Sequence, residues 1–195
     1  MDPVSVLVDR IAALGRNDSR PVLVAIDGGS GAGKSTLARE VGIRIGAVVI
    51  DGDDFYAGGA AADWDAMSAA EKAAHCIDWR RQRPVLETLA RGRAASWHPY
   101  DWESDDGRLL AQPTECQPAP VVILEGVYSA RPELADLIDL RVLCDTPADI
   151  RRQRIVERDG GDDRTEWNRR WEEAENWYLS RVRPPGEFDL VLSGQ

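Results

Sequence analysis

The hydrophobic positions of the chain form short apolar runs that alternate with segments of helical periodicity. Runs of aliphatic, largely β-branched residues predict buried strands, and apolar residues that recur every three to four positions predict helices. The predicted strands cover residues 22–26, 47–50, 121–124, 140–144 and 188–192. The predicted helices cover residues 4–14, 36–45, 67–74, 84–90 and 131–138. One further helix is predicted directly after residues 145–147, and another is predicted to start at Thr165. Alternating strands and helices are typical of an α/β domain.

A glycine-rich motif stands between the first predicted strand and the helix after it. Its residues, Gly28-Gly29-Ser30-Gly31-Ala32-Gly33-Lys34-Ser35, match the phosphate-binding pattern G-x-x-x-x-G-K-[ST] at every fixed position. Lys34 is expected to reach the β- and γ-phosphates of ATP, and Ser35 is expected to ligate Mg²⁺. The expected phosphate-binding residues are Gly29, Ser30, Gly31, Ala32, Gly33, Lys34, Ser35 and Thr36. The alternative is a chance glycine-rich turn, which neither the full match nor the strand–loop–helix context favours.

Acidic residues follow two of the predicted strands. Asp51, Asp53 and Asp54 come after the second strand, and Glu125 ends the third. Ligands bind at the carboxyl ends of strands in open α/β sheets. Carboxylates clustered beside phosphates need a partner charge, so at least one is interpreted as binding a metal ion or a substrate hydroxyl. The alternative is a solvated loop in which Asp51 or Asp54 caps a helix.

The helix that follows 145–147 is rich in arginine. Arg151, Arg154 and Arg158 are spaced i, i+3 and i+7 and therefore share one face. The alternative to a functional role is a solvated basic face. Two glycines at 160–161 then predict a hinge for a mobile lid. On the next helix one stripe, interpreted as packing rather than base stacking, contains Trp167, Trp171, Ala174 and Tyr178.

Composition narrows the class of protein. A chain of 195 residues suits one domain. The net charge of −10 argues against nucleic acid or an anionic membrane as the main partner. No apolar run approaches the roughly 20 residues of a membrane span, and the start does not resemble a signal peptide, so we expect a cytoplasmic protein. The cysteines, Cys76, Cys116 and Cys144, lack metal-ligand spacing and are interpreted as reduced thiols.

Together these features predict an α/β fold of the P-loop NTPase type. We expect a three-layer sandwich with a mostly parallel central sheet, helices on both faces and a small helical lid. One domain with a small inserted lid is expected over residues 1–195. Residues 57–63 are expected to form a mobile loop and residues 113–120 a linker.

With these motifs in place, the chain resembles the uridine kinase family of P-loop kinases, relatives of phosphoribulokinase and pantothenate kinase. The resemblance covers most of residues 20–180. Besides the P-loop it rests on Asp53-Asp54-Phe55-Tyr56, Tyr100-Asp101-Trp102, Leu124-Glu125-Gly126-Val127 and Asp145-Thr146. It implies an enzyme that uses ATP and Mg²⁺ to transfer the γ-phosphate to a hydroxyl of a nucleoside-like or other small acceptor. The resemblance thereby implies one P-loop kinase domain over residues 1–195, with an acceptor-binding insert at about 53–112 and the lid at about 151–168.

The resemblance also implies roles for single residues. Asp53 matches the general base near Mg²⁺, and Glu125 matches the strand-end acid at the metal, so the expected metal ligands are Ser35, Asp53 and Glu125. Arg154 and Arg158 match lid arginines that reach the transferring phosphate, which makes the expected catalytic set Lys34, Asp53, Arg154 and Arg158. The positions implied to bind the acceptor are Tyr56, Asp78, Tyr100 and Arg151.

One acceptor position departs from the family. The uridine and cytidine enzymes carry there a histidine that reads the pyrimidine, and this chain has Asp105. An ionised carboxylate only accepts hydrogen bonds. Together with Trp79, Trp97 and Trp102 it suggests a cationic or amine-bearing acceptor.

Two alternatives stay open at this point. One is a kinase of a different small molecule, such as nicotinamide riboside, pantothenate, a sugar acid or an antibiotic that carries a hydroxyl group. The other is an ATP-binding switch protein that performs no acceptor chemistry. Assembly into a homo-oligomer is also left open.

Overall fold

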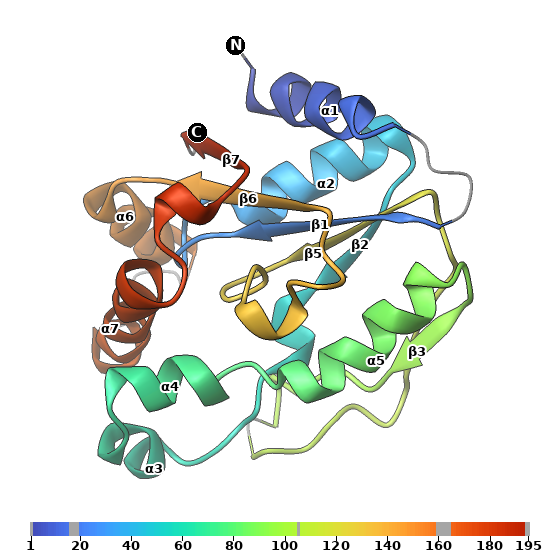
Figure 1. The fold of residues 1–195 in the computed structure, drawn as a ribbon. Coiled ribbons are helices and arrows are strands. Elements are labelled where there is room, and N and C mark those ends of the chain that lie inside the picture. The colour runs from blue at the N-terminus through green and yellow to red at the C-terminus, as the bar shows by residue number, and fades with distance from the viewer. Residues whose placement is uncertain (1, 16–19, 105, 159–164, 194–195) are drawn as a thin grey trace.

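The computed structural model describes residues 2–15, 20–104, 106–158 and 165–193. Its centre is a five-stranded parallel sheet with the strand order β2-β5-β1-β6-β7 (Figure 1). The strands are β1 (Val22–Asp27), β2 (Val48–Asp51), β5 (Val121–Glu125), β6 (Leu140–Asp145) and β7 (Leu190–Ser193). In the register, Val24 of the central strand β1 lies opposite Ile123 on one side and Leu140 on the other. All five predicted strands are confirmed.

Helices cover both faces of this sheet, as predicted. On one face α1 (Pro3–Ala13) and α2 (Lys34–Ile45) bury a core that includes Leu7, Val41 and Ile123. A second core, with Phe55 and Leu124 among its members, lies on the other face, under four further helices. These helices are α3 (Ala61–Ala66), α4 (Ala69–His75), α5 (Trp79–Ala90) and α7 (Thr165–Arg181), and the remaining helix is α6 (Ala148–Arg158).

Residues 57–66 are more ordered than the composition suggests. Helix α3 begins at Ala61, inside the predicted loop, and α4 is a separate helix that starts after Ser68. The buried side chain of Trp64 packs in the second core and holds α3 there. The Gly/Ala-rich sequence alone shows no periodicity that would predict this helix. Ser68 and Glu71 form a capping box that starts α4 anew. The prediction of one helix over 67–74 was therefore wrong at its N-terminal end.

Helix α5 begins five residues earlier than predicted. The side chain of Asp78 accepts a hydrogen bond from the backbone nitrogen of Arg80 at 3.0 Å and so caps the helix at Trp79. Pro84 therefore lies inside the helix, where it cannot donate to the carbonyl of Arg80. Buried Leu86 among other residues holds the helix on the core despite this missing bond.

Two more segments differ from the prediction. Residues 131–138 contain only the short 3₁₀ helix η2 (Pro132–Leu134) instead of an α-helix. The predicted linker 113–120 contains β4 (Thr114–Cys116), which pairs antiparallel with β3 (Ala95–Trp97) in a two-stranded sheet. Two further 3₁₀ helices are η1 (Gly52–Phe55), directly after β2, and η3 (Pro185–Glu187), before β7.

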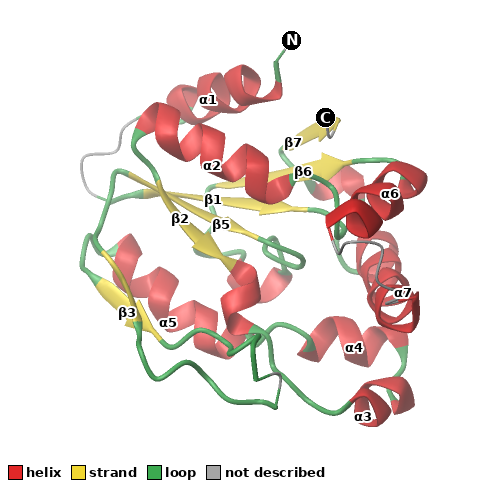
Figure 2. Cartoon of the chain, turned by 180° about the vertical axis from the view of Figure 1, so that it is seen from behind, coloured by secondary structure: helices red, strands yellow, loops and turns green. Residues whose placement is uncertain are grey.

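The arginine-rich helix α6 and helix α7 stand together at one end of the sheet, and α7 packs against α4 (Figure 2). The predicted hinge glycines between them lie outside the described residues. The limits of the insert and of the lid stay predictions. Among the helices that the structure describes, none combines the length and the apolar character that crossing a bilayer requires.

Candidate active site

The glycine-rich motif forms a tight loop between β1 and the N-terminus of α2. Gly28, Gly31 and Gly33 all have positive φ values, 143°, 76° and 93°. A Cβ atom at Gly28 would lie 2.5 Å from the carbonyl oxygen of Cys144, and one at Gly31 would lie 2.6 Å from that of Arg151. The loop therefore requires glycine for both its backbone conformation and its packing.

Lys34 opens α2 and is buried. Its Nζ donates a hydrogen bond to the carbonyl oxygen of Gly29 at 3.0 Å, so the ammonium lies across the loop. The loop is braced from β6, because the Thr146 hydroxyl donates to the carbonyl oxygen of Ala32 at 3.0 Å. The unpaired N–H groups of a helix N-terminus beside a buried lysine make an anion site suited to phosphate.

The three aspartates at the end of β2 and directly after it have separate roles. Asp51 caps η1 by accepting from the backbone nitrogen of Asp53 at 2.9 Å, as the capping alternative foresaw. Asp54 accepts from Trp97 Nε1 at 2.7 Å. Asp53 keeps its carboxylate accessible in a recess. Desolvation there, with Asp51 nearby, raises the pKa of Asp53 to about 6, although Lys34 lowers it.

Glu125 ends the neighbouring strand β5 and is buried. Desolvation, with Asp51 nearby, raises the pKa of Glu125 to about 7, while Lys34 and the Ser35 hydroxyl lower it. In the described part of the chain, no three or more His, Cys, Asp or Glu side chains form a metal-binding group by themselves. A Mg²⁺ ion here would therefore need ligands beyond carboxylates, and a serine hydroxyl, phosphate oxygens and water are suited to it.

Beside Asp53 lies a cavity of about 260 Å³. Aromatic rings form much of its wall, and its polar part includes Ser30 of the P-loop, two carboxylates and one arginine. Its lining residues are Ser30, Asp53, Tyr56, Cys76, Ile77, Trp102, Val127, Tyr128, Arg158, Trp167, Trp171 and Glu175. The P-loop and the proposed general base therefore border one space, as a phosphoryl-transfer site requires.

Tyr56 is at the centre of the aromatic group. Its ring stacks on Trp102 with centroids 4.9 Å apart, and it meets Tyr100 at 4.9 Å and Trp171 at 6.0 Å, both edge to face. Tyr100 is buried behind Tyr56 and is not among the residues that line the cavity. Trp171 combines the packing role predicted for its stripe with a position on the cavity wall.

The arginines of α6 lie along the P-loop. Arg154 Nη1 donates to the carbonyl oxygen of Gly31 at 3.3 Å. Arg151 Nη1 donates to the carbonyl oxygen of Ser30 at 3.1 Å and pairs with Glu175 at 3.3 Å. Arg158 lines the cavity and lowers the pKa of Asp53. Arg151, which the resemblance implies to bind the acceptor, therefore contacts the P-loop and is not among the residues that line the cavity.

Glu175 of α7 is a residue that the sequence reasoning missed. It is buried, and its carboxylate accepts from the backbone nitrogen of Ser30 at 3.0 Å and from the Ser30 hydroxyl at 2.5 Å. It also lines the cavity. The sequence did carry one signal that could have marked Glu175 as functional. The residue directly follows Ala174 and comes four residues after Trp171, beside a stripe of predicted buried positions where a glutamate is unusual.

Asp27, at the end of β1, was also missed. This buried carboxylate accepts from the backbone nitrogens of Gly28, Tyr128 and Ala130 and from the Tyr178 hydroxyl, at 2.7–3.0 Å. Desolvation raises the pKa of Asp27, and these hydrogen bonds oppose the rise. Asp27 thereby ties the start of the P-loop to the loop after β5 and to α7.

The other residues predicted to bind the acceptor do not all line this cavity. Asp78 caps α5 and is not among the lining residues. Asp105 lies outside the described residues. Of the three tryptophans proposed beside it, Trp102 lines the cavity, whereas Trp97 binds Asp54 and Trp79 lies against Arg80, with their centres 4.6 Å apart.

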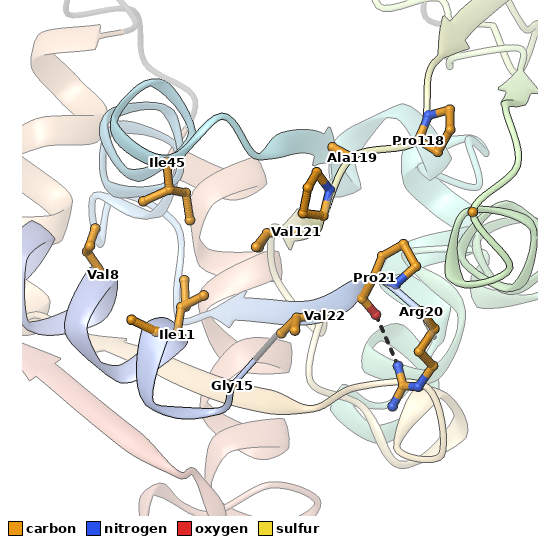
Figure 3. A pocket seen from close by; sticks show the side chains of 13 residues that line it. Val8, Ile11, Gly15, Arg20, Pro21, Val22, Ile45, Pro118, Ala119 and Val121 are labelled. Atoms are coloured by element: carbon orange, nitrogen blue, oxygen red, sulfur yellow. Dashed lines mark hydrogen bonds between the residues drawn. The ribbon is translucent and has the colours of Figure 1, made fainter. Parts of the chain in front are cut away.

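A larger cavity, of about 550 Å³, lies at the opposite edge of the sheet, where β1 and β5 begin (Figure 3). Apolar side chains such as Ile11, Ile45 and Val121 line it. Its charged lining residue, Arg20, is paired with Asp139. Size alone therefore does not mark the site, because this cavity lacks groups for acid–base or phosphate chemistry among its lining residues.

The strand–loop–helix with a buried lysine, facing strand-end carboxylates, defines a P-loop nucleotide-binding protein of the kinase type. The fold agrees. A solved structure described as a possible uridine kinase from Bacillus stearothermophilus superposes with a TM-score of 0.71 at 21% identity, covering 98% of both chains. A candidate fructose transport system kinase from Silicibacter gives a TM-score of 0.76 at 20% identity, covering 98% of this chain and 99% of that one.

Sequence comparison defines the family. Residues 23–166 match the model of the phosphoribulokinase/uridine kinase family. A uridine kinase of Halobacterium salinarum is 32% identical over 178 residues, which cover 84% of this chain and 72% of that protein. One of Clostridium perfringens is 29% identical over 175 residues, covering 85% and 79%. The chain belongs to the phosphoribulokinase/uridine kinase family, as its motifs predicted.

Proposed function

We propose that the chain is an ATP-dependent kinase that transfers the γ-phosphate to a hydroxyl of a small, nucleoside-like acceptor. The observation that carries this proposal is the shared cavity, in which Ser30 of the P-loop and Asp53 line the same space. ATP binds with its phosphates on the backbone of residues 29–36, and Lys34 neutralises charge on the β- and γ-oxygens. The acceptor occupies the cavity lined by Tyr56 and its neighbouring rings.

Asp53 is the proposed general base. It accepts the proton of the acceptor hydroxyl as that oxygen attacks the γ-phosphorus, and the bond to the ADP oxygen breaks. An accessible carboxylate with a pKa of about 6 is ionised at neutral pH and remains a better base than an ordinary aspartate. Bound Mg²⁺, for which Ser35, Asp53 and Glu125 are the candidate residues, would neutralise charge on the phosphates.

The arginines of α6 complete the proposed site. Arg154 donates to the P-loop carbonyl oxygen of Gly31, and Arg158 lines the cavity and lowers the pKa of Asp53. Positioned arginines stabilise charge on the transferring phosphoryl group. A kinase that uses ATP and a small-molecule acceptor is compatible with a cytoplasmic location, and this location is part of the proposal. The proposal also includes no nucleic-acid partner and no membrane partner.

The direct test is an acceptor panel with Mg·ATP. Uridine, cytidine, nicotinamide riboside, pantothenate and D-glycerate are each incubated with the protein, with ADP release and product mass as readouts. We expect acceptor-dependent ADP release and a product heavier by one phosphoryl group. The control reaction omits the acceptor and measures ATP hydrolysis. ADP release that is the same with and without every acceptor would refute the kinase function and favour an ATP-binding switch.

A further inference from the structure

Tyr128, in the loop after β5, has an unusual backbone conformation. Its φ is 62°, and no other non-glycine residue in the described part of the chain has a positive φ. A bulky side chain in this region is strained, and such strain persists only where the surrounding structure imposes it. Residues strained in this way cluster at functional sites.

The surroundings that impose this conformation are specific. The backbone nitrogen of Tyr128 donates to Asp27 at 3.0 Å, and that of Ala130 donates to the same carboxylate at 2.9 Å. The ring of Tyr128 packs edge to face on Tyr178, with centroids 4.9 Å apart. Tyr128 is therefore fixed from the P-loop side by Asp27 and from α7 by Tyr178.

The hydroxyl of Tyr128 has no hydrogen-bond partner in the structure. The residue is 2% exposed, and it lines the cavity beside Asp53. Buried polar side-chain atoms nearly always have a partner, so an orphaned hydroxyl needs an explanation. By contrast, the neighbouring Tyr178 hydroxyl is paired with Asp27 at 2.9 Å.

We propose that Tyr128 is an acceptor-recognition residue whose hydroxyl pairs with an oxygen of the acceptor in this cavity. This inference rests on the proposed kinase function. Ionised Asp53 and Glu175, also on the wall, only accept hydrogen bonds. A phenol both donates and accepts, so it suits a hydroxyl or carbonyl oxygen of the acceptor other than the hydroxyl that receives the phosphoryl group.

Tyr128→Phe isolates the hydroxyl, because the ring and its packing on Tyr178 remain. With the acceptor that the panel identifies, we expect the acceptor KM to rise about tenfold or more, the value of one buried hydrogen bond. The KM for ATP should stay within about twofold of the wild-type value. The melting temperature of the free protein should be equal or higher, because an unpaired buried hydroxyl is removed.

Two controls sharpen the result. Tyr178→Phe removes a paired phenol, so it should lower the melting temperature. An acceptor analogue that lacks the recognised oxygen should lose affinity for the wild-type protein but show no further loss with Tyr128→Phe. Additive losses in the variant and the analogue would contradict a direct contact.

The outcomes separate the two proposals. An active wild-type protein whose acceptor KM is unchanged in Tyr128→Phe overturns the role of Tyr128 and leaves the kinase function standing. A wild-type protein that phosphorylates no member of the panel overturns the kinase function and the role of Tyr128 together. A selective rise in the acceptor KM supports both.

Discussion

The carboxylate of Glu175 accepts hydrogen bonds from both the backbone nitrogen and the hydroxyl of Ser30, although 145 residues separate the two in the chain. Ser30 belongs to the P-loop, and Glu175 lies four residues after Trp171 on α7. Both Glu175 and Trp171 line the proposed acceptor cavity. Glu175 therefore connects the phosphate-binding loop directly to the helix that forms the acceptor wall.

Glu175→Ala should destabilise the protein strongly. It leaves Arg151, whose side chain is 10% exposed, without its partner at 3.3 Å. Removing one member of a buried ion pair costs about 3–5 kcal/mol, because the other charge stays buried. Denaturant unfolding measures this loss. The matched control is Glu172→Ala, which breaks an exposed pair with Arg152 and should cost about 1 kcal/mol or less. Equal losses in the two variants would contradict a structural role for the Glu175 pair.

The P-loop was predictable because its signal is local. Eight consecutive residues carry the glycines, the lysine and the serine, and their conformational needs are met by their own sequence. Glu175 and Asp27 were not predictable in the same way. Their partners, Ser30 and Tyr128, are 145 and 101 positions away, and only the folded sheet and α7 bring them together.

The errors in secondary structure have a similar origin. Pro84 is favoured in a first helical turn, but Asp78 provides a cap that starts α5 earlier. The Gly/Ala-rich stretch before Ala66 gives little periodicity, and α3 depends on the tertiary packing of Trp64. Tertiary contacts thus override local preference at these positions.

Lys34→Ala should abolish phosphoryl transfer while leaving the fold intact. The ammonium lies on the P-loop, 3.0 Å from the carbonyl oxygen of Gly29, and is expected to reach the β- and γ-phosphates. Acceptor-dependent ADP release and circular dichroism measure the two effects. The control is Arg39→Ala on the exposed side of α2, which should keep its activity. Substantial turnover by Lys34→Ala would show that another cation performs this role.

Asp53→Asn should reduce kcat by about 10²–10⁴, the usual contribution of a general base, while ATP affinity stays close to the wild-type value. Steady-state kinetics with varied acceptor and varied ATP separate the two effects. The matched control is Asp54→Asn, one residue away, where the carboxylate binds Trp97 instead of facing the cavity. Normal turnover by Asp53→Asn would mean that another group takes the proton.

The same variant tests the pKa of Asp53 through stability. Desolvation raises this pKa from 3.8 to about 6 in the folded protein, so ionisation of Asp53 opposes folding. Well below pH 3.8 the group is protonated in both states, and its cost builds up as the pH rises from 3.8 to about 6 and stays constant above that. Without Mg²⁺ and ATP, Asp53→Asn should therefore melt above the wild-type protein at about pH 8 and approach it only at about pH 4. A difference that is independent of pH would contradict the raised pKa.

Asp78 offers a choice between two roles that substitution can separate. The family resemblance implies that Asp78 binds acceptor hydroxyls, and this stays a prediction, whereas its side chain caps α5 at 3.0 Å from the nitrogen of Arg80. Asparagine is as good an N-cap as aspartate, and alanine costs about 0.5–2 kcal/mol. We expect Asp78→Asn to keep wild-type stability and acceptor KM, and Asp78→Ala to lose stability. Thermal melting and acceptor kinetics on both variants provide the readouts, and a large rise in acceptor KM for Asp78→Asn at unchanged stability would assign the residue to the acceptor instead.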